Sequence, residues 1–288
     1  MLSPDITIIG TGGLGSALAR GLNAKDISIK SIFNRTKAKA TLLARQIEVE
    51  RSGTFPNSTV EVGELIFLTV PDRCIKPVSS RLASLDDEWS NKTVVHCSGN
   101  ESADLLDDLK QKGATTASFH PLQTFPPESS PDRFEDIYFN MQGDPSAFPL
   151  LKRIAEQLEA NSFEVDDNEK SHLHAAAVIA SNYLHTILDI AVGTAVLGGL
   201  SREESKKALL PLVKQTVENA EKFSLEDSLT GPIERGDIST VKKHLKLLEK
   251  NELLRDIYVE LGRSTVSLAA RSGAISEETA DQFYGLLK

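Results

Sequence analysis

The feature that most restricts what this chain can fold into is an apolar strand followed directly by a glycine-rich turn and a helix. Residues 5–10, DITIIG, form the strand pattern, and GTGGLG at 10–15 leads into a helix that begins SALA. In such a turn the first glycine permits tight bending, the second lets the backbone approach a pyrophosphate, and the third allows close helix packing. The helix N-terminus offers free N–H groups to the anion. We therefore expect a dinucleotide site at Gly10, Thr11, Gly12, Gly13, Leu14 and Gly15; the alternative is a glycine-rich turn without a ligand.

Alternating strand and helix patterns fill the first half of the chain. Strands are predicted at 27–34, 64–72, 92–99, 114–119, 137–142 and 162–165, with helices at 15–22, 37–46 and 147–159. This alternation predicts an α/β fold, a doubly wound parallel sheet with helices on both faces. After Asp167 only helical periodicity remains, at 168–197, 201–223, 238–250, 251–272 and 276–287. We expect a nucleotide-binding domain over 1–166 and an all-helical domain over 167–288, with the boundary between Val165 and Lys170.

Composition excludes several classes of protein. The chain has 32 basic and 41 acidic residues, a net charge of −9, and so lacks the basic field that nucleic acids require. Cys74 and Cys97 show no disulfide or metal-ligand spacing, and no metal is expected. The sequence contains neither a signal pattern nor an uninterrupted apolar run of 18 residues. We expect a soluble, cytoplasmic protein without a membrane or nucleic-acid partner.

The end of the second predicted strand indicates which dinucleotide is bound. An acidic residue there would bind the ribose of NAD, but the chain instead has Asn34, Arg35, Thr36 and Lys37. Two cations and a hydroxyl suit the 2′-phosphate of NADP(H). The alternative is that Arg35 and Lys37 simply begin a solvated helix.

Three loops are expected at the carboxyl edge of the sheet, where doubly wound folds bind ligands. Val70, Pro71, Ser98 and Gly99 follow two of the strands and should line the nicotinamide. Beside them, we interpret His96 as a strand-end histidine with a satisfied hydrogen bond, and Cys97 as a small packing thiol. The third loop carries His120 as a substrate-binding residue, or else is a structural turn with an aromatic plug.

A helix in the second half has polar residues where apolar ones are the rule. At about 100° per residue, one stripe collects most of them, whereas His172 points to the opposite side. The stripe has hydroxyl, amide and imidazole groups suited to binding a small substrate and passing it a proton: Lys170, His174, Ser181, Asn182, His185 and Asp189. The alternative is a polar seam between domains or between subunits.

The loop at 229–237, LTGPIERGD, is compact and ends at a predicted helix cap, Asp237. Arg235 in this loop has the charge to bind a substrate carboxylate. The alternative is that the loop only reverses the chain between helices.

Taken in order, these motifs resemble the Rossmann oxidoreductases that carry a helical C-terminal domain of unknown function 2520. Seven segments carry the resemblance: GTGGLG (10–15), NRT (34–36), LTVPD (68–72), HCSG (96–99), FHPLQTF (119–125), HAAAVIASN (174–182) and LTGPIERGD (229–237). The chain is more distantly similar to pyrroline-5-carboxylate reductase, F420-dependent NADP oxidoreductases and 6-phosphogluconate dehydrogenase-like proteins. The resemblance implies an NADP(H) domain, a helical domain that commonly mediates homodimerisation, and an active site between them.

The expected function is an NADP(H)-dependent oxidoreductase that reduces a small keto acid or a cyclic imine. His174 would donate or relay the proton, Asn182 would bind the substrate oxygen or nitrogen, and Lys170 would stabilise charge. The catalytic lysine of β-hydroxyacid dehydrogenases precedes an asparagine on the corresponding helix, but Lys170 and Asn182 are 12 positions apart with His174 between them. That lysine role is therefore not transferred. Two alternatives remain: a dedicated ketopantoate- or pyrroline-5-carboxylate-type reductase, and a noncatalytic NADP(H)-binding dimer.

Overall fold

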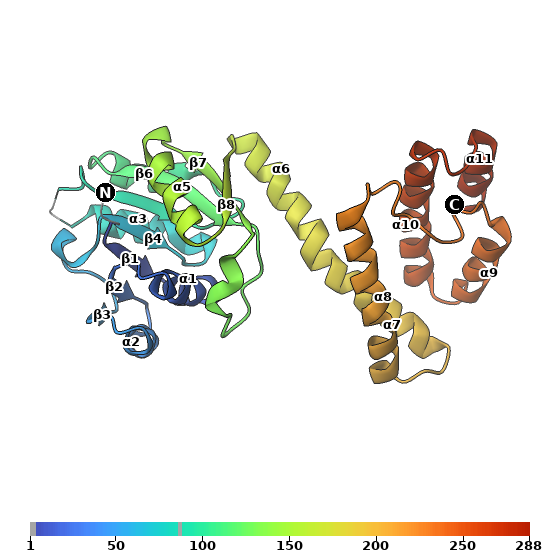
Figure 1. Ribbon diagram of the computed structural model, residues 1–288, viewed down its shortest axis with the longest axis horizontal. Coiled ribbons are helices and arrows are strands. Elements are labelled where there is room, and N and C mark those ends of the chain that lie inside the picture. Colours follow the sequence, from blue (N-terminus) through green and yellow to red (C-terminus); the bar gives the residue numbers. More distant parts are fainter. Residues whose placement is uncertain (1–3, 86–87) are drawn as a thin grey trace. The chain divides into compact units, whose positions relative to one another are not determined.

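The computed structural model describes residues 4–85 and 88–288 and divides into two compact units, Met1–Ile179 and Ala180–Lys288 (Figure 1). The first unit contains an eight-stranded sheet in the order β3-β2-β1-β4-β5-β6-β7-β8. Its strands are β1 (Ile6–Ile9), β2 (Ile29–Phe33), β3 (Arg51–Gly53), β4 (Leu65–Leu68), β5 (Thr93–His96), β6 (Thr115–Pro121), β7 (Tyr138–Gly143) and β8 (Asn161–Glu164). The order of the first six strands is that of a Rossmann fold, as expected.

The sheet departs from the expected parallel arrangement at β7. Neighbours from β3 to β6 are parallel, but β7 pairs antiparallel with β6, and β8 is again parallel to β7. A parallel neighbour needs a crossover that carries the chain back to the starting edge, usually a helix. Between β6 and β7 the structure has only a short 3₁₀ turn, η4 (Pro131–Phe134), so β7 starts at the edge where β6 ended. This reversal brings Asn140 directly opposite His120.

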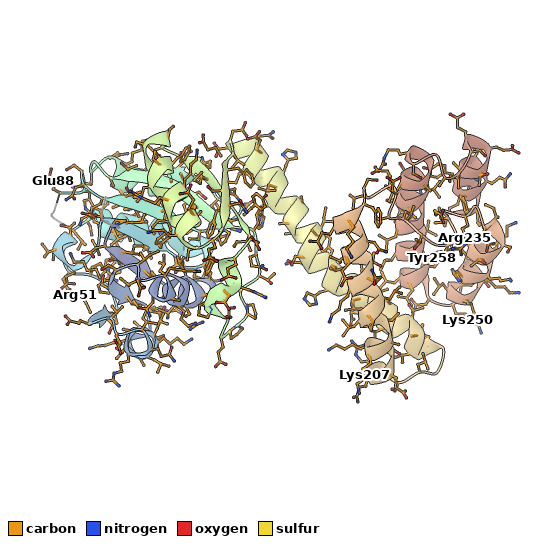
Figure 2. All side chains as sticks on the ribbon, viewed as in Figure 1. Arg51, Glu88, Lys207, Arg235, Lys250 and Tyr258 are labelled. Atoms are coloured by element: carbon orange, nitrogen blue, oxygen red, sulfur yellow. The ribbon has the colours of Figure 1, made fainter. Side chains whose placement is uncertain are left out.

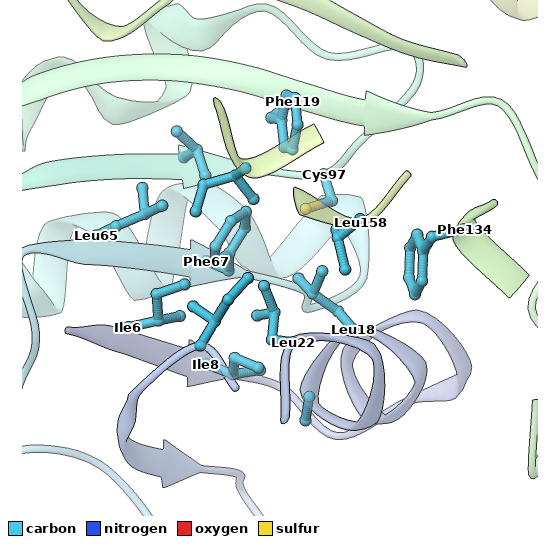
Figure 3. Close-up of a cluster of buried hydrophobic side chains, with 14 of the residues drawn as sticks. Ile6, Ile8, Leu18, Leu22, Leu65, Phe67, Cys97, Phe119, Phe134 and Leu158 are labelled. Atoms are coloured by element: carbon cyan, nitrogen blue, oxygen red, sulfur yellow. The ribbon is translucent and has the colours of Figure 1, made fainter. Parts of the chain in front are cut away.

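Helices cover both faces of the sheet, as expected. They are α1 (Gly13–Ala24), α2 (Lys37–Gln46), α3 (Ile75–Ala83), α4 (Asp107–Lys110) and α5 (Phe148–Gln157). Alternate strand residues enter two separate cores: Ile8 and Phe67 pack with α1, α2 and α5, whereas Ile9 and Ile66 pack with α3 and α4. Figure 3 shows the first of these cores, with Phe67 between Ile8 and Phe119.

The second unit is helical throughout. After α6 (Asp167–Ala177), which belongs to the first unit, come α7 (Leu184–Leu197), α8 (Arg202–Lys222), α9 (Ile238–Leu248), α10 (Glu252–Arg271) and α11 (Glu277–Leu286). The last three helices enclose a core of their own that includes Val241, Val266 and Phe283. An ion pair between Asp189 and Arg202 links α7 to α8, so one member of the predicted polar stripe has a structural partner.

The predicted helix over 168–197 is confirmed as a continuous run, Asp167–Leu197, but its middle is not α-helical. Residues 178–183 form a π-helical segment, η6 (Val178–Tyr183), between α6 and α7. A π turn closes on the fifth residue instead of the fourth, so residues after it lose the α-helical phase of those before it. The single stripe from Lys170 to Asp189 assumed 100° per residue throughout, and residues 178–183 depart from that value.

The same run has the length and apolar composition of a membrane-spanning helix, with a mean hydropathy of 1.4 and 6% of that window buried. By these two criteria alone it is the one such helix among residues 4–85 and 88–288. The division of the chain into two units falls within this run, between Ile179 and Ala180. They divide later than residue 166 because the first turns of α6 pack on the sheet through the buried Lys170.

Candidate functional site

The glycine turn lies between β1 and α1, with Gly12 at the N-cap position. Gly10 has a φ of +114°, and a Cβ there would lie 2.6 Å from the Thr69 carbonyl oxygen. A Cβ on Gly15 would lie 2.1 Å from the Gly10 carbonyl oxygen, and one on Gly13 would lie 2.2 Å from that of Phe125. The packing of the protein itself therefore requires glycine at these three positions.

Gly12 is different, because a Cβ there would meet no atom within 4 Å. Its φ of −74° is also open to any residue, so neither packing nor backbone conformation requires a glycine. The neighbouring Thr11 hydroxyl is buried without a hydrogen-bond partner in the described part of the chain. Open space over Gly12, an unpaired hydroxyl and the free N–H groups of the first turn of α1 fit a pyrophosphate. Leu14, by contrast, packs against the core.

Hydrogen bonds connect the end of β2 to the glycine turn. The Asn34 side chain accepts a hydrogen bond from the Thr11 N–H at 3.4 Å and donates one to the Thr36 carbonyl at 3.2 Å. Arg35, Thr36 and Lys37 are exposed, and neither cation has an acidic partner among the ion pairs of the described residues. Two free cations therefore lie beside the turn, where a phosphate on the adenosine ribose would bind.

The loops after β4 and β5 lie at the same sheet edge as the glycine turn, because β1, β4 and β5 are adjacent and parallel. Thr69 donates a hydrogen bond from its hydroxyl to the Gly10 carbonyl at 2.8 Å. Val70 is half-buried and Pro71 exposed, whereas Ser98 and Gly99 are buried. The four residues predicted to line the nicotinamide thus lie at the same edge of the sheet. Next to Ser98 and Gly99, which follow β5, lies a group of buried polar side chains.

Lys170 of α6 is the central group of this site and is only 1% exposed. Its Nζ donates hydrogen bonds to the Ser98 carbonyl at 2.8 Å and to the Ser118 hydroxyl at 2.6 Å. Burial lowers its pKa to about 8, because the charged ammonium is removed from water. Sequence reasoning included Ser118 only in the strand-ending segment 118–125 and did not pair it with Lys170, although a polar residue in the buried pattern of β6 was an available signal.

Two further histidines lie above Gly99. A Cβ on Gly99 would lie 2.5 Å from His174 Nδ1 and 2.8 Å from His120 Nε2. The two rings are 6.2 Å apart between centroids and inclined at 76°. His120 Nδ1 lies 3.1 Å from the side-chain nitrogen of Asn140, a residue that sequence reasoning also missed. Lys170, His120 and His174 are thus brought together as predicted site residues at one end of the sheet.

His96 and Cys97, which lie beside this cluster, are structural, as interpreted from the sequence. His96 Nδ1 accepts from the Ser98 N–H at 3.2 Å, and Nε2 lies 3.0 Å from the Ser102 carbonyl. Both ring nitrogens therefore have partners, and burial lowers the pKa of His96 to about 4. Burial raises the pKa of the Cys97 thiol to about 12, which keeps it protonated and unreactive.

Two predicted residues belong to the second unit. Asn182 is exposed in the π-helical segment, and Arg235 is exposed in the loop before α9 (Figure 2). The cap predicted at Asp237 is confirmed, since its carboxylate accepts from the Thr240 N–H at 3.0 Å. Nearby, His244 pairs with the Tyr258 hydroxyl at 2.8 Å.

Two family models match this chain. Residues 5–100 match the family "NADP oxidoreductase coenzyme F420-dependent", and residues 137–265 match the domain of unknown function DUF2520. These two parts of the chain are thus similar to those two families. The expected resemblance is confirmed, and with it the expectation of an NADP(H)-type oxidoreductase. The first match covers the glycine turn and the end of β2, and the DUF2520 match covers Lys170, His174 and Arg235.

Solved structures share the fold of this chain. Protein TM1727 from Thermotoga maritima is 29% identical, with a TM-score of 0.73 over 92% of this chain and 98% of that one. BF3122 from Bacteroides fragilis is 24% identical, with a TM-score of 0.72 over 91% of this chain and 97% of that one. A pyrroline-5-carboxylate reductase from Coxiella burnetii is 18% identical, with a TM-score of 0.60 over 96% of this chain and 99% of that one. A search of curated proteins gave no match.

Proposed function

We propose that this chain is an NADP(H)-dependent reductase of a small keto acid or cyclic imine. The observation that carries the proposal is the group formed by Lys170, His120 and His174 at the end of β6, on the same sheet edge as the glycine turn. The carboxyl ends of β1 and β6 are three strand spacings apart, about 14 Å. A dinucleotide extended from the turn along this edge has the length to approach that group.

The residues assigned to the cofactor divide by the part that they would hold. The turn from Gly10 to Gly15 takes the pyrophosphate, and Asn34, Arg35 and Thr36 take the ribose and its 2′-phosphate. Val70, Pro71, Ser98 and Gly99 line the nicotinamide. When bound, NADPH supplies the hydride. NADP(H) binding is assigned to residues 1–166, and substrate binding and dimerisation are assigned to residues 167–288.

The substrate-side residues hold and protonate the substrate. His174 donates or relays the proton, and the buried ammonium of Lys170 stabilises negative charge that develops nearby. His120 binds the substrate. From the second unit, Asn182 would hydrogen-bond the reacting oxygen or nitrogen, and Arg235 would bind a carboxylate. Small molecules and a second copy of the chain are the proposed partners.

Two alternatives compete with this proposal. A dedicated ketopantoate- or pyrroline-5-carboxylate-type reductase would use the same groups on one substrate; the fold shared with a pyrroline-5-carboxylate reductase is the reason to test cyclic imines. A noncatalytic NADP(H)-binding dimer would use only the nucleotide site. It does not account for the buried lysine and the two histidines gathered at the sheet edge.

The deciding experiment is an NADPH-oxidation screen of the full chain against panels of 2-keto acids and cyclic imines. We expect turnover on at least one panel, and His174→Gln should lower kcat about 10²-fold without changing NADPH affinity, because proton transfer is lost but the nucleotide site is intact. His172→Gln, an exposed histidine on the same helix, is the matched control and should be neutral. Tight NADPH binding with no turnover on either panel would favour the noncatalytic alternative.

A further inference from the structure

Each of the two histidines beside Gly99 has one ring nitrogen close to this glycine. A Cβ built on Gly99 would lie 2.5 Å from His174 Nδ1, 2.8 Å from His120 Nε2 and 2.9 Å from His120 Cε1. The two nitrogens are therefore no more than about 5.3 Å apart, close enough for one small polar atom to hydrogen-bond both. His174 Nδ1 is buried and has no protein partner in the described residues. Buried polar atoms are normally paired, so an unpaired nitrogen here indicates a position for a ligand atom.

Asn140 determines which nitrogen of His120 carries the proton. Asn140 is 1% exposed, and its place opposite His120 is fixed by the antiparallel pairing of β6 and β7. Its side-chain nitrogen, a donor, lies 3.1 Å from His120 Nδ1. With that nitrogen as its partner, Nδ1 accepts and the ring proton of neutral His120 lies on Nε2, while Asn140 Oδ1 is left without a partner among the described residues. The Nε2–H group is thus a donor on the part of the ring that lies nearest to Gly99.

We propose that Asn140 is a positioning residue that fixes His120 as an Nε2–H donor, so that His120 and His174 together bind one substrate carbonyl oxygen between their two rings. A carbonyl oxygen has two lone pairs and accepts from both rings. A protonated cyclic imine offers only an N–H at this atom and would meet the Nε2–H of His120 as a second donor. Resting on the proposed reductase, this inference selects keto acids over cyclic imines.

The reduction balances with these groups. With NADPH bound, its hydride would supply the new C–H bond at the carbonyl carbon, and the π electrons of C=O would move onto the oxygen. His174 donates its proton to that oxygen to form the hydroxyl and recovers one from water, while the cofactor leaves as NADP⁺. His120 remains neutral and holds the oxygen throughout.

The surroundings of His120 keep it neutral. Burial, and then the positive charge of Lys170, lower its pKa to about 3; His174 and His96 also face it and act in the same direction. A neutral imidazole gives up only one N–H. Its tautomer, set by Asn140, therefore decides whether a donor faces Gly99.

Long-range ¹H–¹⁵N NMR of the full chain with ¹⁵N-labelled histidine tests the tautomer without cofactor or substrate. We expect His120, assigned with His120→Gln, to be neutral and protonated at Nε2 from pH 8 down to pH 5. Asn140→Asp replaces the donor by an acceptor and should move the proton to Nδ1. Protonation at Nδ1 in the wild-type chain, or an unchanged tautomer in a folded Asn140→Asp variant, would overturn the proposal.

Kinetics test the substrate class separately. Asn140→Asp should lower kcat on a keto acid about 10²-fold and leave the KM for NADPH unchanged, because the oxygen loses one fixed donor. Asn140→Leu, which removes the amide but supplies no acceptor, should lower kcat by a smaller factor. Turnover confined to cyclic imines would overturn the carbonyl assignment and leave the reductase proposal standing. The Nε2–H tautomer without turnover on either substrate class would defeat the reductase and leave the tautomer assignment standing.

Discussion

At the level of single residues, the glycines of the turn differ in which atoms an added Cβ would meet. Gly15 has the Gly10 carbonyl oxygen 2.1 Å from its Cβ position, whereas Gly12 has open space. We expect Gly12→Ala to leave the melting temperature unchanged and to weaken NADPH binding at least tenfold, about 1.4 kcal/mol, because the methyl group keeps the backbone from the pyrophosphate. Calorimetric titration with NADPH and a thermal melt of the same sample measure both effects.

Gly15→Ala is the matched control. It should destabilise the fold by about 2 kcal/mol or more, because the added methyl overlaps backbone atoms that cannot move independently. If Gly12→Ala binds NADPH as tightly as the wild type, the pyrophosphate does not approach Gly12 and the assignment of the turn is wrong.

The same residues explain which parts of the site could be predicted from the sequence. The glycine turn and the Asn34–Lys37 segment are local patterns, so the sequence was sufficient to find them. Ser118 and Asn140 act through contacts with Lys170 and His120, which depend on strand register and on how α6 packs. The periodicity of the sequence indicates neither the strand register nor the packing of α6. Asn140 and Gln142 in an otherwise buried strand were the available clue.

At the level of elements, Lys170 connects α6 to β5 and β6, and its charge makes that connection depend on pH. Its pKa is lowered from 10.5 to about 8 on folding, so between these values the unfolded chain binds more protons than the folded one. Stability from this group therefore rises as pH increases from about 8 to 10.5, by roughly 3 kcal/mol in total. We expect the wild-type stability curve to rise relative to that of Lys170→Met over this window, measured by denaturant unfolding.

Lys152→Met provides the control for this measurement. Lys152 is 46% exposed and pairs with Glu164 at the surface, so its curve should run parallel to the wild type. Parallel curves for wild type and Lys170→Met would mean that Lys170 is not desolvated in the folded protein.

Elements were predictable where a local pattern determines them. Helix α2 was predicted with its observed bounds, and the helices of the second unit to within a few residues. Strand β3, RSG, was missed because it is a three-residue edge strand without β-branched residues. The direction of β7 depends on a connection that lacks a crossover helix, and the π-helical segment has no signal in the hydrophobic pattern. Both affect the site, by placing Asn140 opposite His120 and by changing the phase of the helix after Lys170.

At the level of the whole molecule, the proposed homodimer accounts for the apolar surface of α7 and α8. Ile187, Leu197 and Leu212 are 41%, 66% and 63% exposed, a density of large apolar side chains that a soluble monomer rarely carries. Burying such a surface against a second copy would stabilise the assembly by about 25 cal/mol for each Å² of apolar area removed from water. We expect light scattering in detergent-free buffer to give twice the chain mass of 31.4 kDa.

Charged substitutions test which surface forms the dimer interface. Ile187→Glu combined with Leu212→Glu should give a folded monomer, because two carboxylates cannot be buried in an apolar interface without a partner. Leu42→Glu, at an apolar residue of α2 that is 61% exposed, should leave the dimer intact. A wild-type monomer at all concentrations would contradict the dimer. Solubility only in detergent would instead favour a membrane role for the run Asp167–Leu197, whose length and composition meet that requirement.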